Sequence, residues 1–169
     1  MGRRIVTAAY LEGDFVLRSG RRSRYYLDKY LFATDPAILR ELGEVLAVRL
    51  PPGTERVAGS ELGAVPLATA ASLASGLPSV LVRKAPKTYG TAKRFEGALN
   101  PGERIVLVED VLTTGGQAID SATALRDFGV QVVLVLAVID REEGAAAAMR
   151  AAGFELQALF TRTSLGLAA

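Results

Sequence analysis

Residues 104–120, RIVLVEDVLTTGGQAID, pass from an apolar run through two acidic residues into a turn of small and hydroxyl-bearing residues. The apolar run predicts a buried strand, and residues 116–129 have helical spacing with a glycine at the expected C-terminal end. In open α/β sheets, ligands bind outside the carboxyl ends of the strands. The stretch therefore predicts an α/β fold with a binding site where the strand gives way to the helix.

The same alternation of apolar runs and helical stretches continues on both sides of this segment. The expected strands are 55–60, 79–84, 104–110, 131–140 and 154–160. The expected helices are 63–76, 116–129 and 141–153, which end at Gly76, Gly129 and Gly153. Short runs of Val, Leu and Ile suit a sheet buried on both faces, and strand–helix alternation implies right-handed crossovers. The sequence thus predicts a mostly parallel sheet in a single domain over residues 1–169.

Two segments depart from this alternation. Residues 13–30 predict a hairpin-like insert, and a helix is expected within 34–50, with Asp35 as its N-cap and Pro36 at its first position. Residues 84–103 are too long for a structureless connection in a compact domain, unless they have a function. This length favours a functional loop.

The composition excludes several kinds of chemistry. The chain has no cysteine and no histidine, which excludes disulfides, thiolate nucleophiles, Ser-His-Asp triads and zinc sites built from these residues. Hydrophobic residues make up 50% of the chain and charged residues 22%, as is typical of a globular protein. Carboxylates, Lys, Arg, Tyr, hydroxyls, backbone amides or an oxygen-bound cation must therefore carry any reaction.

Charge and hydropathy bear on partners and location. A net charge of +2 argues against a dedicated nucleic-acid binder. No apolar run reaches membrane-spanning length, and the first residues lack a long signal-peptide core. We therefore expect no nucleic-acid partner, no membrane association and a cytoplasmic location.

The turn after the acidic pair is a candidate anion site. The first N–H groups of a helix lack backbone partners and lie at the positive end of its dipole, so they suit a phosphate, and Thr113 and Thr114 can add hydroxyl donors. Glu109 and Asp110 can accept hydrogen bonds from sugar hydroxyls, or meet a cation through its waters. Together these features favour a ribose 5-phosphate ligand. The alternative is an N-capped helix beside two solvated acids, and neither a Walker loop nor a GxGxxG fingerprint is present.

The segment VLVEDVLTTGG, residues 106–116, resembles the signature with which type I phosphoribosyltransferases bind 5-phosphoribosyl 1-diphosphate (PRPP). Four further segments are similar, in order and spacing, to segments of orotate phosphoribosyltransferases. They are GDFVLRSGRRSRYYLD (13–28), AGSELGAVPLATA (58–70), VRKAPKTYG (82–90) and VIDREEG (138–144). In that family they are the N-terminal hood segment, the pyrophosphate-side loop, the mobile basic loop and the base-binding turn. The resemblance covers nearly the whole chain.

This resemblance implies a doubly wound sheet with a small N-terminal hood at about 1–35 and a mobile basic loop at about 84–103. The implied reaction transfers ribose 5-phosphate from PRPP to N1 of orotate, giving orotidine 5′-monophosphate and pyrophosphate in de novo pyrimidine biosynthesis. Mg²⁺, held mainly by PRPP rather than by protein ligands, is the implied cofactor. Two alternatives remain: a phosphoribosyltransferase for a purine or uracil, and a non-catalytic PRPP-sensing regulator that binds nucleic acid.

The resemblance also assigns the PRPP side of the site, where Lys87, Glu109 and Asp110 are the expected catalytic residues. The implied PRPP-binding residues are Arg83, Lys84, Lys87, Tyr89, Glu109, Asp110, Val111, Leu112, Thr113, Thr114, Gly115, Gly116 and Gln117. Residues 60–64 would lie beside the pyrophosphate, although an ordinary strand-to-helix turn is the alternative. Tyr89 stands where the family usually has histidine, and tyrosine carries no positive charge near neutral pH.

The basic loop and the base-binding residues complete the implied site. Lys87 would reach the site of a neighbouring subunit, which implies a homodimer with shared active sites; the alternative is a solvated basic surface loop. The implied orotate-binding residues are Thr113, Arg141, Arg18, Tyr25 and Tyr26. The guanidinium of Arg141 can bind the orotate carboxylate with two hydrogen bonds, whereas the alternative is an ion pair with Glu142 or Glu143. The two tyrosines would lie over the base, or be hairpin core residues.

Overall fold

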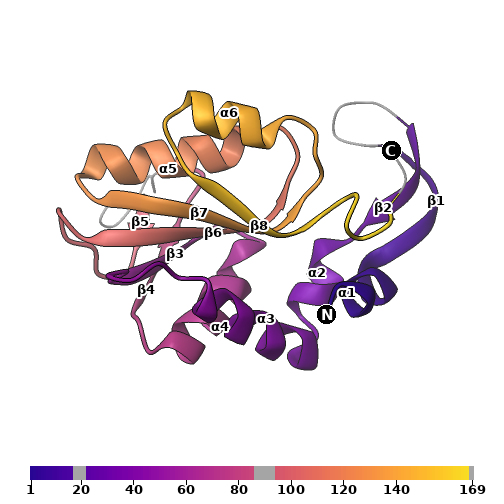
Figure 1. Ribbon diagram of the computed structural model, residues 1–169, viewed down its shortest axis with the longest axis horizontal. Helices are drawn as coiled ribbons and strands as arrows, with labels where there is room; N and C mark the ends of the chain where they lie inside the picture. Colours follow the sequence, from indigo (N-terminus) through magenta and orange to yellow (C-terminus); the bar gives the residue numbers. More distant parts are fainter. Residues whose placement is uncertain (17–21, 86–93, 168–169) are drawn as a thin grey trace.

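The structure is a computed structural model that describes residues 1–16, 22–85 and 94–167. Its centre is a six-stranded sheet in the order β5-β4-β3-β6-β7-β8 (Figure 1). The strands are β3 (Arg56–Ser60), β4 (Ser79–Val82), β5 (Phe95–Glu96), β6 (Arg104–Leu112), β7 (Gln131–Asp140) and β8 (Leu156–Thr161). All neighbouring strands pair in parallel except β5, which is antiparallel to β4. The predicted α/β class and mostly parallel sheet are confirmed.

Helices cover both faces of this sheet. α3 (Pro36–Val48) and α4 (Ala64–Ser75) lie on one face, and α5 (Gly116–Phe128) and α6 (Ala145–Ala151) lie on the other (Figure 1). The side chains of β6 alternate between two cores. Val106 and Val108 pack on the side of α3 and α4, whereas Ile105 and Leu107 pack on the side of α5 and α6. The continuous apolar run of β6 is therefore explained by burial on both faces, and the sheet is doubly wound as predicted.

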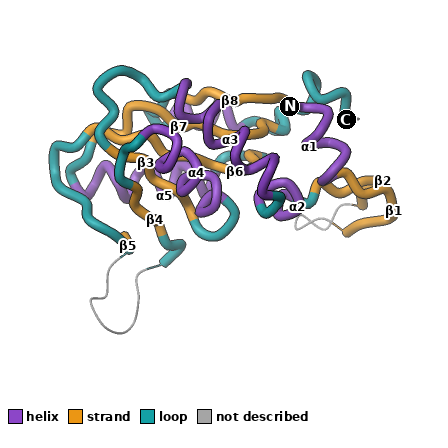
Figure 2. Tube along the Cα trace, turned by 90° about the horizontal axis from the view of Figure 1, so that it is seen from below, coloured by secondary structure: helices purple, strands orange, loops and turns teal. Residues whose placement is uncertain are grey.

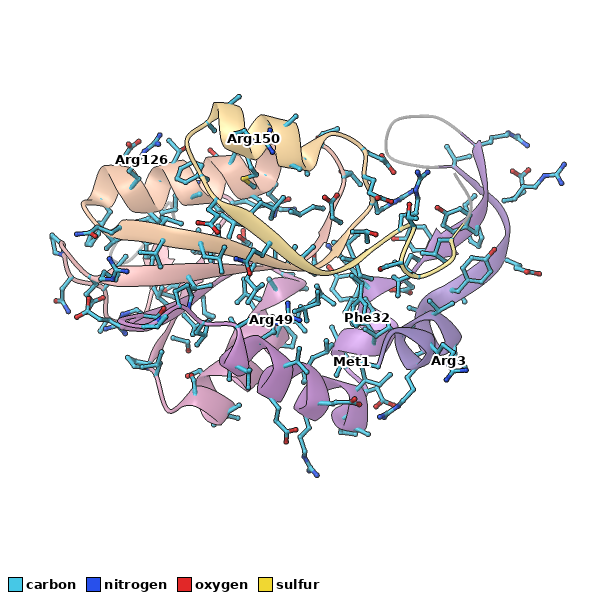
Figure 3. All side chains as sticks on the ribbon, in the orientation of Figure 1. Met1, Arg3, Phe32, Arg49, Arg126 and Arg150 are labelled. Carbon is cyan, nitrogen blue, oxygen red and sulfur yellow. The ribbon has the colours of Figure 1, made fainter. Side chains whose placement is uncertain are left out.

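A smaller unit lies beyond the carboxyl ends of the parallel strands. It consists of α1 (Gly2–Ala9), β1 (Tyr10–Val16), β2 (Arg22–Leu27) and α2 (Lys29–Ala33). β1 and β2 form the predicted hairpin, a separate antiparallel sheet. Phe32 of α2 is fully buried in the core cluster that also includes α3 and α4 residues (Figure 3). Both ends of the described chain lie near this unit (Figure 2). This unit, residues 2–33, falls within the predicted hood segment and is called the hood below; it lies over the edge of the sheet at which ligands are expected (Figure 1).

Several predicted boundaries differ from the structure. Strand β6 extends to Leu112, so Glu109 and Asp110 lie inside it rather than at its end. The helix predicted over 141–153 begins only at Ala145, because Glu142 and Gly144 have the positive φ angles of a turn, 58° and 105°. That helix ends at Ala151 with Ala152 as its C-cap, and Gly153 follows with a φ of 79°, so the glycine predicted to end the helix takes the left-handed conformation one residue after the cap.

Other local predictions are confirmed, and some elements were not predicted. Asp35 caps α3 by accepting hydrogen bonds from the N–H groups of Ala37 and Ile38. Gly76 and Gly129 are left-handed C-caps of α4 and α5. The sequence did not indicate α1, α2 or β5, which are short or amphipathic. Among the described residues, none of the helices combines the length and the apolar character that a membrane span requires.

Candidate active site

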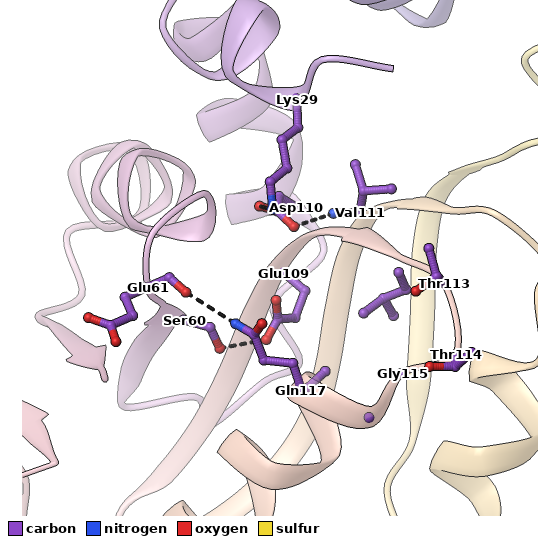
Figure 4. Close-up of a pocket in the computed structure, with 13 residues that line it drawn as sticks. Lys29, Ser60, Glu61, Glu109, Asp110, Val111, Thr113, Thr114, Gly115 and Gln117 are labelled. Atoms are coloured by element: carbon purple, nitrogen blue, oxygen red, sulfur yellow. Dashed lines mark hydrogen bonds and ion pairs between the residues drawn. The ribbon is translucent and has the colours of Figure 1, made fainter. Parts of the chain in front are cut away.

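A pocket opens where β3 and β6 end, and the hood lies above it (Figure 4). It is lined by Lys29, Ser60, Glu61, Glu109, Asp110, Val111, Leu112, Thr113, Thr114, Gly115, Gly116, Gln117 and Ala118. The predicted PRPP-binding stretch from Glu109 to Gln117 thus lies entirely along the pocket wall. Lys29 comes from the hood, and Ser60 and Glu61 come from the predicted pyrophosphate-side turn.

The turn into α5 forms one side of the pocket. Gly115 is the N-cap of α5 with a φ of 81°, and a Cβ atom at this position would lie 3.3 Å from Ala145. Only glycine meets both requirements without strain. No side chain caps the helix, and Thr113, Thr114 and Gln117 are exposed. The start of α5 therefore offers backbone and hydroxyl donors to an anion from solvent.

Glu109 occupies the floor of the pocket and is only 5% exposed. The Ser60 hydroxyl donates a hydrogen bond to Glu109 Oε1 at 2.5 Å and lies 3.1 Å from the Ser121 hydroxyl. Burial raises the pKa of Glu109 to about 7, against the opposing effects of the Ser60 hydrogen bond and the Lys29 charge, while the Asp110 charge raises it further. Glu109 is thus a buried acid that titrates near neutral pH.

Asp110 is equally buried, but it has a charged partner. Its Oδ2 lies 2.7 Å from the Nζ of Lys29, and its Oδ1 accepts a hydrogen bond from the Val111 N–H at 2.5 Å. The alternative of two solvated acids is therefore wrong for both carboxylates. Sequence reasoning missed Lys29, because only the packing of α2 over the strand ends distinguishes it from an ordinary surface lysine.

Glu61 links three parts of the site. Its carboxylate accepts a hydrogen bond from the Lys84 N–H at 2.6 Å, and its carbonyl oxygen accepts one from the Gln117 side chain at 3.1 Å. The turn after β3 is therefore tied both to the start of α5 and to the first described residues of the basic loop. An ordinary strand-to-helix turn would not need these two hydrogen bonds to other segments of the site.

The predicted basic residues that the structure describes do not line the pocket. Neither Arg83 nor Lys84 is among its lining residues. Arg83 Nη1 lies 3.9 Å from Glu96 Oε1, and Arg94 pairs with Asp120. Lys87, Tyr89 and Arg18 fall outside the described residues.

Of the predicted base-binding residues, Arg141 and Tyr25 meet near the end of β7. The N–H of Arg141 donates to the Leu112 carbonyl at 2.9 Å, and its Nη2 lies 3.0 Å from Glu143 Oε1. Its guanidinium also lies 5.9 Å from the ring centroid of Tyr25, which is 8% exposed. Tyr26, the next residue of β2, is 41% exposed and packs near Phe15. Arg141 thus makes the ion pair that was the alternative, and it also contacts one of the two predicted tyrosines.

Comparison with known proteins identifies the family. No family model matches the chain, so the identification rests on individual relatives. The orotate phosphoribosyltransferase of Methanocella arvoryzae is 45% identical over 159 residues, which cover 94% of this chain and 91% of the relative. The chain belongs to the orotate phosphoribosyltransferase family. The predicted family is confirmed, and with it the prediction of an enzyme of the pentosyltransferase class.

Solved structures of the family agree with this fold. The orotate phosphoribosyltransferase of Aeropyrum pernix has a TM-score of 0.85 and 32% identity, over 98% of this chain and 96% of the other. The Mycobacterium tuberculosis orotate phosphoribosyltransferase in complex with PRPP has a TM-score of 0.79 and 32% identity, with the same coverage. The type I phosphoribosyltransferase architecture predicted from the sequence is therefore confirmed.

Proposed function

We propose that this chain transfers the ribose 5-phosphate group of PRPP to N1 of orotate, giving orotidine 5′-monophosphate and pyrophosphate in de novo pyrimidine biosynthesis. One observation carries the proposal: the buried acid pair and the Thr-Gly turn line a single pocket in a chain of this family. The match to orotate phosphoribosyltransferases favours orotate over a purine or uracil and an enzyme over a non-catalytic regulator. Arg141 also favours orotate, because purines and uracil lack the carboxylate that a guanidinium can bind.

PRPP would lie along β6 and the start of α5. Backbone N–H groups from Thr114 to Gln117 would bind the 5′-phosphate, because they lie at the positive end of the helix dipole. Glu109 and Asp110 would accept hydrogen bonds from the ribose hydroxyls. The acid pair lies next to this turn in the pocket wall, as the ribose lies next to the 5′-phosphate in the substrate.

The reaction breaks the bond between C1 of the ribose and the pyrophosphate oxygen, and it forms the bond between C1 and N1 of orotate. Positive charge develops on the ribose ring and negative charge on the leaving group. Residues 60–64 would border the pyrophosphate, while Arg83, Lys84, Lys87 and Tyr89 would contact PRPP from the basic loop. In this arrangement Glu61 ties the loop to the turn through the Lys84 N–H. Closure of a cationic loop over the leaving group would stabilise its charge and exclude water.

Mg²⁺ would be held by oxygen atoms of PRPP. The described residues include no cluster of three or more acidic side chains that could hold a metal ion, and the carboxylate of Asp110 is paired with Lys29. When bound, the cation shares the negative charge of the leaving pyrophosphate. The protein's part is to orient the ribose through Glu109 and Asp110.

Orotate would bind between the end of β7 and the hood. Arg141 has five N–H donors, so its guanidinium can keep Glu143 as a partner and still bind the orotate carboxylate. Tyr25 lies against this guanidinium and would border the base, together with Thr113, Tyr26 and Arg18.

The proposal extends to organisation and location. Residues 1–169 would act as a single phosphoribosyltransferase domain, with a hood at about 1–35 and a mobile loop at about 84–103. Two copies would form a homodimer in which Lys87 reaches the partner's site, and sedimentation analysis of the purified protein tests this. We place the enzyme in the cytoplasm.

An assay of Arg141→Ala with PRPP, Mg²⁺ and a panel of bases tests the substrate. The KM for orotate should rise about 10- to 150-fold, as expected for losing a charged hydrogen-bonded pair of about 1.5–3 kcal/mol, while the KM for PRPP changes little. Arg141→Lys should recover only part of this loss, because a point charge replaces a planar fork. Uracil should be a poor substrate of the wild type and lose little in the variant. Equal losses for both bases would make Arg141 a structural residue.

A further inference from the structure

Lys29 lies outside the signature segments, yet it reaches the centre of the pocket. It is the first residue of α2, whose N-cap Asp28 accepts a hydrogen bond from the Tyr30 N–H at 3.0 Å. Figure 4 shows the lysine side chain descending from α2 onto Asp110, on the side of the pocket away from the Thr-Gly turn. The Lys29 side chain is 33% exposed, whereas that of Asp110 is 6% exposed. A capped helix of the hood thus places an ammonium group on a buried carboxylate of β6.

Three structural elements hold the carboxylate of Asp110. Lys29 pairs with Oδ2, and the Val111 N–H donates to Oδ1. The turn after β3 closes the third side, because a Cβ atom built on Gly63 would lie 1.7 Å from Asp110 Oδ2 and 3.2 Å from the Lys29 Cε. Only a glycine leaves room for this pair. The orientation of the carboxylate is therefore set jointly by α2, β6 and the turn.

The charges of the pocket are unbalanced without Lys29. Three of its thirteen described lining residues are acids, namely Glu61, Glu109 and Asp110. Lys29 is the one cationic side chain among those described lining residues. PRPP carries a 5′-phosphate and a pyrophosphate, so the acids alone would repel it at this range. A cation beside the ribose acids lowers that repulsion before any loop closes.

We propose that Lys29 is a positioning residue for the transfer: it orients the Asp110 carboxylate toward the ribose hydroxyls and supplies the positive charge that lets PRPP approach the acid pair. The proposal rests on the proposed function, of which it names a further component. A carboxylate oxygen has two acceptor sites, so Asp110 can accept a ribose hydroxyl while Lys29 stays in place. The hood would thus contact the PRPP side of the site through Lys29 and Asp110. It would contact the base side through Tyr25 and Arg141.

The test compares Lys29→Gln and Lys29→Arg with the wild type, by calorimetric binding of PRPP with Mg²⁺ and by steady-state kinetics. Lys29→Gln should weaken PRPP binding and raise the KM for PRPP about 10-fold or more, with a much smaller change in the KM for orotate. Lys29→Arg should restore most of the affinity, because it keeps the charge. The matched control is Arg4→Gln, which removes an exposed pair between α1 and α3, Arg4–Glu41 at 2.6 Å, and should behave as the wild type.

A pH profile separates this role from a purely structural one. The charged groups that face Glu109 are Asp110 beside it on β6 and Lys29 on α2, while Ser60 on β3 donates its hydroxyl hydrogen bond. The Lys29 charge lowers the pKa of Glu109, so the midpoint of the pH dependence of PRPP binding should move to higher pH in Lys29→Gln. Arg4→Gln should leave that midpoint in place.

The outcomes distinguish failure of the inference from failure of the function. Unchanged PRPP affinity in Lys29→Gln overturns the role of Lys29, whatever the activity of the wild type. A second combination of results also overturns the role of Lys29. In it, thermal unfolding shows that both Lys29→Gln and Lys29→Arg are destabilised, and the KM for PRPP and the KM for orotate change equally. A wild type that binds PRPP but forms no orotidine 5′-monophosphate contradicts the proposed function alone, and the binding data then still decide the role of Lys29.

Discussion

The neighbouring strands β3 and β6 carry a charged cluster at each end. The two clusters differ in whether the charge of their buried or partly buried glutamate is compensated by a cation. At the amino ends, Arg56 donates to both carboxylate oxygens of Glu103, at 2.8 and 2.9 Å, and Asn100 adds a third hydrogen bond at 2.8 Å. At the carboxyl ends, Glu109 is buried with a serine hydroxyl as its hydrogen-bond partner. One carboxylate has its charge fully compensated, and the other does not.

This difference appears in the acidity of the two glutamates. The hydrogen bond from Arg56 holds the pKa of Glu103 down at about 2, although burial opposes it. Burial raises the pKa of Glu109 to about 7. A cluster that only supports the fold can satisfy every charge internally, whereas a binding pocket must leave acceptors for its ligand. The contrast is what a structural role for the Arg56 cluster and the proposed ligand-binding role of the Glu109 cluster would require.

The largest expected effect is on stability, from Arg56→Ala. Arg56 is buried and Glu103 is partly buried, so removing the guanidinium takes from Glu103 two charge-assisted hydrogen bonds of about 1.5–3 kcal/mol each. The free energy of unfolding should therefore fall by about 3–5 kcal/mol. The kcat of the folded protein should stay close to that of the wild type, because the cluster lies at the far end of the strands. Denaturant unfolding and kinetics measure both. The exposed pair Arg4–Glu41 provides the control, since Arg4→Ala should cost less than about 1 kcal/mol. A strong loss of kcat in folded Arg56→Ala would contradict the purely structural role of the Arg56 cluster.

The second prediction concerns the pH dependence of stability. Between pH 4.5, the ordinary pKa of a glutamate, and about 7, folded Glu109 keeps a proton that the unfolded chain has lost, so raising the pH favours unfolding. Glu103 acts in the opposite direction: as the pH falls from 4.5 to about 2, the unfolded chain takes up a proton that the folded state excludes. Each contribution amounts to at most about 3.5 kcal/mol, at 1.4 kcal/mol per unit of pKa difference.

Two matched variants measure these slopes separately. Glu109→Gln should remove the decline in the free energy of unfolding between pH 4.5 and 7, since the amide resembles the protonated acid and does not titrate. Glu103→Gln should instead remove the decline below pH 4.5. Denaturant unfolding at a series of pH values is the measurement. If Glu109→Gln kept the slope of the wild type above pH 4.5, Glu109 would be ionised in the folded protein and the contrast between the clusters would disappear.

The third prediction concerns activity and has the smallest expected effect. Asp110→Asn keeps the shape of the side chain but loses the charge that pairs with Lys29 and that we propose accepts hydrogen bonds from the ribose hydroxyls. Turnover should fall by about one to two decades, corresponding to about 1.5–3 kcal/mol for a charge-assisted contact. Asp127→Asn on the exposed side of α5 is the same substitution outside the pocket and should have no effect. Unchanged steady-state kinetics in Asp110→Asn would rule out the ribose role.

Much of the fold and part of the site could be predicted from local sequence. Val106, Ile105 and their neighbours predicted a strand buried on both faces because every position of the run is apolar. Asp35 with Pro36, and Gly129 after α5, marked helix ends through rules that involve only a few adjacent residues. The boundaries of α6 were missed because the conformations of Glu142 and Gly144 depend on the turn that follows β7.

What the sequence by itself determined is the order of the long strands and helices of the main sheet and the adjacency of the acid pair to the Thr-Gly turn. Both follow from side-chain periodicity and from residues that are neighbours in the chain. The tertiary structure alone decided which side chains meet that acid pair. Lys29 reaches Asp110 because α2 packs over the strand ends, and Ser60 reaches Glu109 because β3 and β6 pair in parallel. These contacts join segments distant in sequence, so they depend on chain crossovers and shared burial, and no local pattern encodes them.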